Sequence, residues 1–202
     1  MANLFDSSSN TEATIRRADG EKRILLRPPT DEEWIARQRR VIIHVTRRGR
    51  GITENEIDSY VADAVLYNAI KSEDSPDLVP EEAAAVINQM MRCEVNDVKL
   101  ELDQAWVTMT TAGGSHVAHC LKLPTTLDVT KWRRGMARFI DMPHGRQQVR
   151  TNIQPTLDLY EKCYIQADGY VNGVPALHKD TAMQAVVNAC ESGAEALKEE
   201  DF

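Results

Sequence analysis

The chain has 202 residues, of which 42% are hydrophobic and 27% are charged, and its formal net charge at pH 7 is −7. A chain of this length can bury one sizeable core. An acidic total is unlike that of a general nucleic-acid binder. No apolar run approaches the roughly 18 residues that cross a bilayer, and the start of the chain lacks the pattern of a signal peptide. We therefore expect a soluble, intracellular protein without a membrane partner.

The first fifty residues are expected to hold a flexible segment, an edge strand and a helix. Residues 1–21 are polar and serine-rich, which predicts a flexible segment. Residues 22–27 alternate weakly and read as an edge strand that Pro28 stops. Thr30 and Glu33 form a capping box, and apolar residues follow at helical spacing. These features predict one helix from residue 30 to about residue 48.

Further helix starts occur along the chain. Residues 53–56 form a second capping box, and Pro80 suits a first helical position. Thr125 and Asp128 form another capping signature. We therefore expect helices to begin near Thr53, Pro80, Thr125, Pro155 and Asp180.

Residues 94–123 give the clearest sheet signal. Alternating apolar residues, a β-branched and aromatic run, and a Gly113-Gly114 turn predict a three-stranded antiparallel meander. The residues expected on its apolar face are Val98, Leu100, Leu102, Val117, His119, Leu121 and Leu123. The fold class is thus α+β, a meander at about 94–123 packed by five to six helices, in a single domain over residues 22–202. No internal repeat is visible.

Charge is segregated along the chain. Residues 16–50 carry a net charge of +6 and residues 53–103 a net charge of −10. Residues 124–150 carry +4 and residues 151–202 carry −6. Because opposite surface potentials attract and orient partners, these blocks predict a homo-oligomer.

Arginines are the candidate interaction residues. Six arginines and no acid lie within residues 37–50, on a predicted basic helix. Guanidinium groups match both carboxylates and phosphates, so a protein partner and a nucleic-acid backbone are the two alternatives. A second group follows the meander. The full set is Arg37, Arg39, Arg40, Arg47, Arg48, Arg50, Arg133, Arg134 and Arg138.

Local motifs for catalysis or metal binding are not evident in the sequence. His116 and His119 are three positions apart on a predicted strand and therefore point to opposite faces, which excludes joint chelation of a metal. The four cysteines lack paired spacing and have apolar neighbours, which predicts buried free thiols in a reducing cytoplasm. They are Cys93, Cys120, Cys163 and Cys190. We expect no enzyme, no metal and no cofactor, with an active site assembled from distant residues as the remaining enzymatic alternative.

Two stretches carry a family resemblance. The first is Arg27-Pro28-Pro29-Thr30-Asp31-Glu32-Glu33-Trp34 with Ala36-Arg37-Gln38-Arg39-Arg40, and the second is the hairpin with Leu123-Pro124-Thr125 and its helix. Over residues 27–140 the chain resembles the tail assembly chaperones of tailed bacteriophages. The resemblance implies a non-enzymatic morphogenesis protein that binds the tape-measure or tube protein in the host cytoplasm, or an accessory protein that stays in the virion.

Overall fold

The computed structural model describes residues 11–18, 20–48, 52–143, 146–171 and 173–199. These residues form an α+β fold with six helices and ten strands in three antiparallel sheets. The sequence pattern predicted one domain over residues 22–202. The structure instead divides the chain into two compact units. Unit 1 comprises Met91–Trp132 and Pro155–Phe202, and unit 2 comprises Ser8–Met90 and Arg133–Gln154.

Unit 2 contains two sheets and three helices. Its elements from the first half of the chain are β1 (Thr11–Arg17), β2 (Gly20–Leu26), α1 (Asp31–Arg40), β3 (Ile42–Arg48), β4 (Ile52–Asp58), α2 (Tyr60–Ile70) and α3 (Pro80–Met90). It also contains β8 (Ala137–Met142) and β9 (Arg146–Thr151). Strands β1 and β2 form a two-stranded sheet, and the other four strands form a second sheet in the order β4-β3-β9-β8.

The predicted flexible segment 1–21 holds a strand in its second half. Thr11–Arg17 forms β1 and pairs with β2 along its whole length, so flexibility is a wrong prediction for these residues. The physical reason is pairing with buried apolar positions, since Ala13 lies opposite the fully buried Ile24. Residues 1–10 lie outside the described part of the chain.

The predicted long basic helix is also wrong beyond Arg40. The Thr30–Glu33 capping box is present and starts α1, but Val41 caps the helix in an extended conformation. The next residues, Ile42–Arg48, form β3. β-branched residues favour a pleated strand over a helix, and β3 finds partner strands on both sides.

The second capping box, at residues 53–56, does not start a helix. These residues lie in β4, and α2 begins later, at Tyr60, after a Ser59 N-cap that makes no side-chain cap hydrogen bond. A hairpin with β3 accounts for the difference, because its seven paired positions satisfy the backbone groups that a helix would otherwise use.

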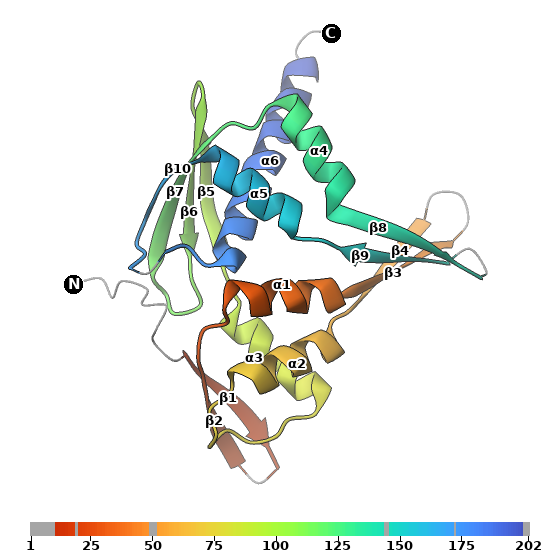
Figure 1. The fold of residues 1–202 in the computed structure, drawn as a ribbon, viewed down its shortest axis with the longest axis vertical. Coiled ribbons are helices and arrows are strands. Elements are labelled where there is room, and N and C mark those ends of the chain that lie inside the picture. The colour runs from red at the N-terminus through yellow and green to blue at the C-terminus, as the bar shows by residue number, and fades with distance from the viewer. Residues whose placement is uncertain (1–10, 19, 49–51, 144–145, 172, 200–202) are drawn as a thin grey trace. The chain divides into compact units, whose positions relative to one another are not determined.

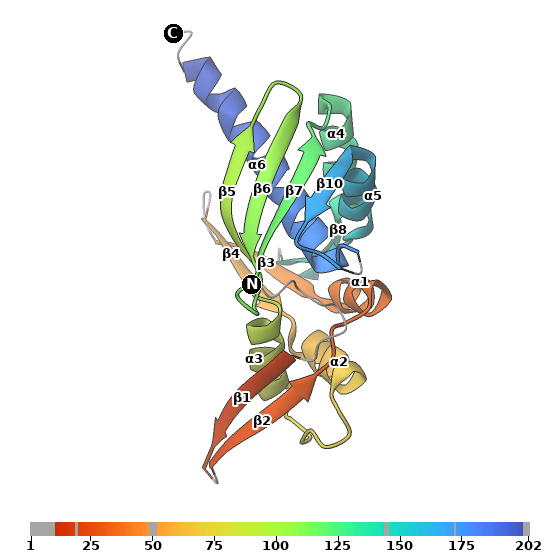
Figure 2. The ribbon, with the colours of Figure 1, turned by 90° about the vertical axis from the view of Figure 1, so that its left-hand side faces the viewer.

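Unit 1 contains one four-stranded sheet with helices on it. Its elements are β5 (Glu94–Leu100), β6 (Gln104–Thr110), β7 (His116–Lys122), α4 (Thr126–Met136), α5 (Gln154–Cys163), β10 (Tyr164–Asp168) and α6 (Ala176–Glu199). The last turn of α4 and the first residue of α5 fall in unit 2. Figure 2 shows the four strands side by side, in the order β10-β7-β6-β5.

Strands β5, β6 and β7 pair in sequence order over the residues of the predicted meander, but the sheet has four strands and not three, because β10 pairs with β7. Gly114 sits in the β6–β7 turn with φ of 77°, a conformation that glycine adopts without strain. The core combines β6 and β7 with α5 and α6, through residues such as Val107, Leu121, Tyr160 and Met183.

The predicted buried face of β5 is wrong at its end. Leu100 is 39% exposed and Leu102 is fully exposed. The register of β5 against β6 shifts between Val95 and Asp97, as in a β-bulge, and β5 is the outer strand of its sheet. The irregularity precedes Val98, and Leu100 still lies opposite the buried Ala105, so Leu100 is exposed because it ends an outer strand. Leu102 lies in the connection between β5 and β6.

The two halves of the chain repeat one order of elements, which the sequence pattern did not reveal. A hairpin, a helix, a second hairpin and two helices occur as β1-β2-α1-β3-β4-α2-α3 and again as β6-β7-α4-β8-β9-α5-α6. The second series has the additional strand β10 between α5 and α6, and β5 lies between the two series. Both middle hairpins have a three-residue connection, between Arg48 and Ile52 and between Met142 and Arg146. Corresponding elements start about ninety-five positions apart, as α1 and α4 do at Asp31 and Thr126.

Tertiary contacts repeat as well. The Thr30 capping box of α1 has its counterpart in Thr125, whose hydroxyl accepts from the Asp128 amide and donates to its carboxylate. The helices that follow are joined at corresponding positions in both halves, by a hydrogen bond from Arg37 Nε to Asp63 Oδ1 (2.8 Å) and by one from Trp132 Nε1 to Thr156 Oγ1 (3.0 Å). Corresponding contacts are made by different residue types in the two halves. For this reason the repeat is not visible in the sequence.

A last pair of contacts fixes the alignment of the two halves. Leu26 at the end of β2 bridges to Lys71 just after α2, and Leu121 of β7 pairs with Tyr164 just after α5. Leu26 and Leu121 are both fully buried. We conclude that the chain consists of two structural repeats.

Candidate interaction surface

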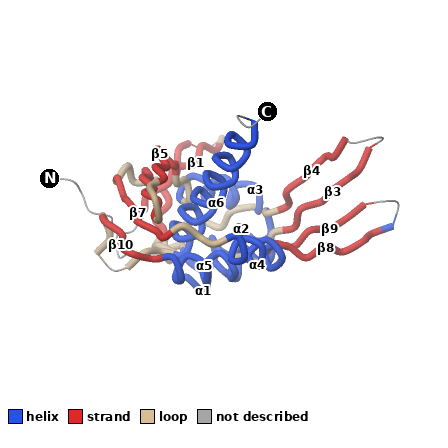
Figure 3. Tube along the Cα trace, turned by 90° about the horizontal axis from the view of Figure 1, so that it is seen from above, coloured by secondary structure: helices blue, strands red, loops and turns tan. Residues whose placement is uncertain are grey.

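The sheet β4-β3-β9-β8 joins the two repeats. Each repeat contributes one hairpin, and β3 of the first repeat pairs with β9 of the second, from Ile42 opposite Arg150 to Thr46 opposite Arg146. Figure 1 shows these strands lying side by side, and Figure 3 shows them extending beyond α1 of the same unit.

One face of this sheet carries an apolar row across all four strands. Ile57, Ile43, Val149 and Phe139 are opposite one another in the register, and directly opposed residues share a face. Val149 in the middle is 6% exposed, whereas Ile57 and Phe139 at the two edges are 63% and 66% exposed. The row thus ends in a large exposed apolar side chain on each edge strand.

Helix α2, which follows β4 in the chain, also has exposed apolar residues. Tyr60 is 50% exposed, Val61 65% and Val65 44%. Val61 and Val65 are four positions apart and lie on the same side of the helix. Exposed apolar clusters of this kind mark interaction sites more often than single exposed residues do.

The two edge strands differ in charge. Strand β4 contains Glu54, Glu56 and Asp58 and no base, whereas β8 contains one base, the exposed Arg138, and one acid, Asp141, and begins directly after the basic end of α4. Within the described residues, β4 and β8 each pair on one side only. An edge strand presents unpaired backbone N–H and C=O groups and is a template for a further strand.

Arg37, the first of the sequence candidates, is part of the core of unit 2. Its Nε and Nη2 atoms both lie 2.8 Å from Asp63 Oδ1, and its guanidinium carbon lies 4.9 Å from the centroid of the Trp34 ring. The Arg37 side chain is 12% exposed and that of Asp63 is fully buried. Arg37 is therefore a structural residue that connects α1 to α2.

The other candidate arginines are divided between several elements. Arg39 and Arg40 are exposed in the last turn of α1, and Arg40 donates back to the Ala36 carbonyl. Arg47 and Arg48 belong to β3, and Arg50 lies outside the described residues. Arg133 and Arg134 are exposed at the end of α4, and Arg138 is exposed in β8. The predicted basic helix is thus divided between the end of α1 and the strand β3. The second group of arginines is divided between the end of α4 and the strand β8.

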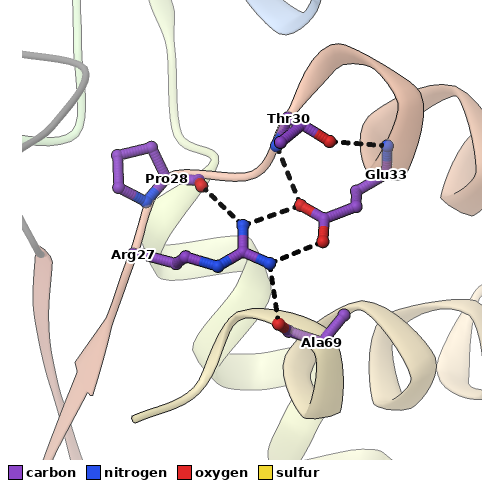
Figure 4. Close-up of polar contacts among 5 residues, drawn as sticks. All are labelled: Arg27, Pro28, Thr30, Glu33 and Ala69. Carbon is purple, nitrogen blue, oxygen red and sulfur yellow. Dashed lines mark hydrogen bonds and ion pairs between the residues drawn. The ribbon is translucent and has the colours of Figure 1, made fainter.

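A residue that the arginine count passed over organises the start of α1. Arg27 forks onto Glu33, with Nη1 2.8 Å from Oε2 and Nη2 2.6 Å from Oε1. The same guanidinium donates to the carbonyls of Pro28 and Ala69, so it ties the capping box to the end of α2 (Figure 4). The hydrogen bonds from Arg27 are the main reason why the pKa of Glu33 falls to about 2.

Replacing Arg27 by alanine should destabilise unit 2 by about 1–2 kcal/mol, because charge-assisted hydrogen bonds are lost but 43% of the side chain is exposed to screening solvent. The matched control is Lys122→Ala, because Lys122 occupies the corresponding position before the Thr125–Asp128 capping signature and is exposed. We expect the control to change stability by less than about 0.5 kcal/mol. Urea denaturation measures both, and equal losses would contradict the role given to Arg27.

Unit 1 holds a separate polar cluster that is buried. His119 Nδ1 and Nε2 lie 2.8 Å from the hydroxyls of Tyr160 and Tyr170, and the Tyr170 hydroxyl lies 3.0 Å from His178 Nδ1. His119 is fully buried and His178 is 4% exposed. The hydrogen bonds connect β7, α5 and α6, so the cluster holds the unit together.

A glycine brings this cluster together. Gly169 has φ of 91°, and a Cβ atom there would lie 2.9 Å from the His116 carbonyl oxygen. Only glycine lets the loop after β10 approach β7 this closely and place Tyr170 against His119.

Among the described residues, no group of three or more His, Cys, Asp and Glu side chains could hold a metal ion. No described helix is both long and apolar enough to span a membrane. Cys120 and Cys163 are buried and Cys93 and Cys190 partly buried, and burial raises the pKa of all four thiols. In comparisons with known proteins, no family model, curated protein or solved structure matches the chain.

Proposed function

We propose that this chain is a non-enzymatic assembly protein, a morphogenesis factor of a tailed bacteriophage that acts by protein–protein contact through the β4-β3-β9-β8 sheet. The observation that carries the proposal is the surface of that sheet, where Ile57 and Phe139 are each more than 60% exposed on opposite edges of one apolar row. Such side chains are costly to leave in water and are stabilised by a partner.

The phage assignment rests on the resemblance at residues 27–40 and 116–140. The partners proposed on this basis are the tape-measure or tube protein, met in the host cytoplasm, with retention in the virion as an accessory protein. Binding of nucleic acid is the less supported function, because Arg37 is held by Asp63 and the other arginines of residues 37–50 do not lie on one helix.

The test is co-purification from cells that express the tagged chain together with the neighbouring genes. We expect the tube or tape-measure protein in the eluate, and we expect Ile57→Ser with Phe139→Ser to reduce its recovery. Leu102→Ser is the control, because Leu102 is fully exposed but lies outside this sheet. Recovery of duplex DNA with a steep salt dependence and of no tail protein would contradict the proposal.

A further inference from the structure

The order of strands in the joint sheet is head-to-tail. If β3 and β4 are called the first and second strands of the first repeat, β8 and β9 are the first and second strands of the other. In the order β4-β3-β9-β8, a first strand (β3) pairs with a second strand (β9). The two outer strands are then β4, which is the second strand of the first repeat, and β8, which is the first strand of the second repeat. Two-fold symmetry would have paired like with like and left no complementary edges.

We infer that β8 of one copy pairs with β4 of another copy, repeating between chains the β3–β9 pairing that joins the two repeats within one chain. This inference deepens the proposed function, on which it rests for its biological setting. Because the contact is head-to-tail, it is heterologous, and repeated addition of copies yields a closed ring or a helical filament.

The internal pairing predicts the register between copies. The two middle hairpins have connections of equal length, so β8 residues correspond to β3 residues, and β9 to β4, at a spacing of 94 positions. Ile43 opposite Val149 then becomes Ala137 opposite Asn55 of the neighbouring copy, and His44 opposite Gln148 becomes Arg138 opposite Glu54. This correspondence keeps each face in register, since Ile43 and Ala137 lie on the same face of the sheet.

Charge supports the same partner. The register puts basic Arg138 opposite an acid of β4, and cross-strand pairs of opposite charge stabilise a sheet. Glu56 on β4 is exposed, as are Arg134 and Arg138 near the start of β8. The acidic β4 disfavours a contact of β4 with β4, whereas the start of β8, with Arg138 and the preceding Arg134, is basic and complements β4, which favours the head-to-tail contact. Asp141 lies at the other end of β8.

Disulfide trapping tests this contact directly. Asn55 and Ala137 lie on the two outer strands of one sheet, separated by three strand spacings or about 14 Å, which is too far for a disulfide within the chain. Asn55→Cys with Ala137→Cys should therefore yield a ladder of covalent oligomers on non-reducing gels. The matched control is Ile57→Cys with Ala137→Cys, on the same strands but two residues out of register. A ladder of equal yield in the control, or none in the test pair, would overturn the inference.

Charge reversal supplies an independent test. Sedimentation at low salt should show wild-type oligomers, and Arg138→Glu should weaken association at least tenfold. Adding Glu54→Lys to that variant should restore association, whereas Arg92→Glu, at an exposed site outside this sheet, should leave it unchanged. Association rises with protein concentration by mass action. A wild-type protein that remains monomeric at about 100 µM would therefore overturn self-pairing. If that monomer still retained tail proteins, the proposed function would stand without it.

Discussion

Replacing Asp63 by alanine is expected to destabilise unit 2 by about 3–5 kcal/mol, because it leaves the guanidinium of Arg37 without a counter-charge in a mostly desolvated position. Asp63 is fully buried, and the Arg37 side chain is 12% exposed. Among the described residues, Asp63 Oδ2 and the Trp34 indole nitrogen have no hydrogen-bond partner, so the Oδ1 contact carries the interaction. Guanidinium denaturation followed by circular dichroism measures the loss.

Two variants control this prediction. Arg37→Met with Asp63→Leu removes both charges together, and we expect it to lose less stability than Asp63→Ala alone, since apolar groups of similar volume often replace a buried ion pair at little cost. Trp132→Phe removes the donor of the corresponding neutral hydrogen bond in the second repeat, leaves the contact of Thr156 with Asp180 in place, and should cost only about 1–2 kcal/mol. A loss below about 1 kcal/mol for Asp63→Ala would mean that Arg37 reaches solvent when its partner is removed.

Mild acid is expected to destabilise unit 1, because two buried histidines are uncharged in the folded state. Burial lowers the pKa of His119 and of His178 from 6.5 to about 4, and the charge of His178 adds to the shift of His119. Below pH 6.5 the unfolded chain binds protons that the folded unit does not. Stability is therefore constant above this value and falls towards pH 4, by up to about 1.4 kcal/mol per pH unit for each histidine.

Other groups of the chain titrate differently and can be separated. Burial raises the pKa of Asp180, so proton binding there offsets part of the loss. Glu33 and Asp128 have pKa values of about 2, through hydrogen bonds from Arg27 and Lys162 respectively, and their contributions are lost at lower pH. The histidine effect is thus the one expected between pH 6.5 and about 4.5.

Urea midpoints at pH 7.5, 6.0 and 5.0 measure the effect. His119→Gln with His178→Gln should flatten the profile while lowering stability at pH 7.5, because the hydrogen bonds of the tyrosines are reduced. His116→Gln is the matched control, an exposed histidine on the same strand whose loss should leave the slope unchanged. A wild-type midpoint that is constant from pH 7.5 to 5.0 would contradict the prediction.

The sequence by itself determined the features whose causes lie within a few residues. The Thr30–Glu33 capping box, the helix start at Pro80 and the Gly114 turn were predicted and are confirmed, because each depends on hydrogen bonds or backbone angles over four or five positions. The α+β class was also predictable, since it follows from the periodicity of apolar residues.

The tertiary structure alone decided the surface on which function is proposed. Residues 42–48 have apolar spacing that suits a helix, and they form β3 because β9, more than one hundred positions away, supplies hydrogen bonds along one side. Arg37 was counted as a surface residue because the sequence does not show that Asp63 lies buried beside it. Contacts between distant segments outweigh local preference at such positions, and the same contacts created the two complementary edges of the sheet.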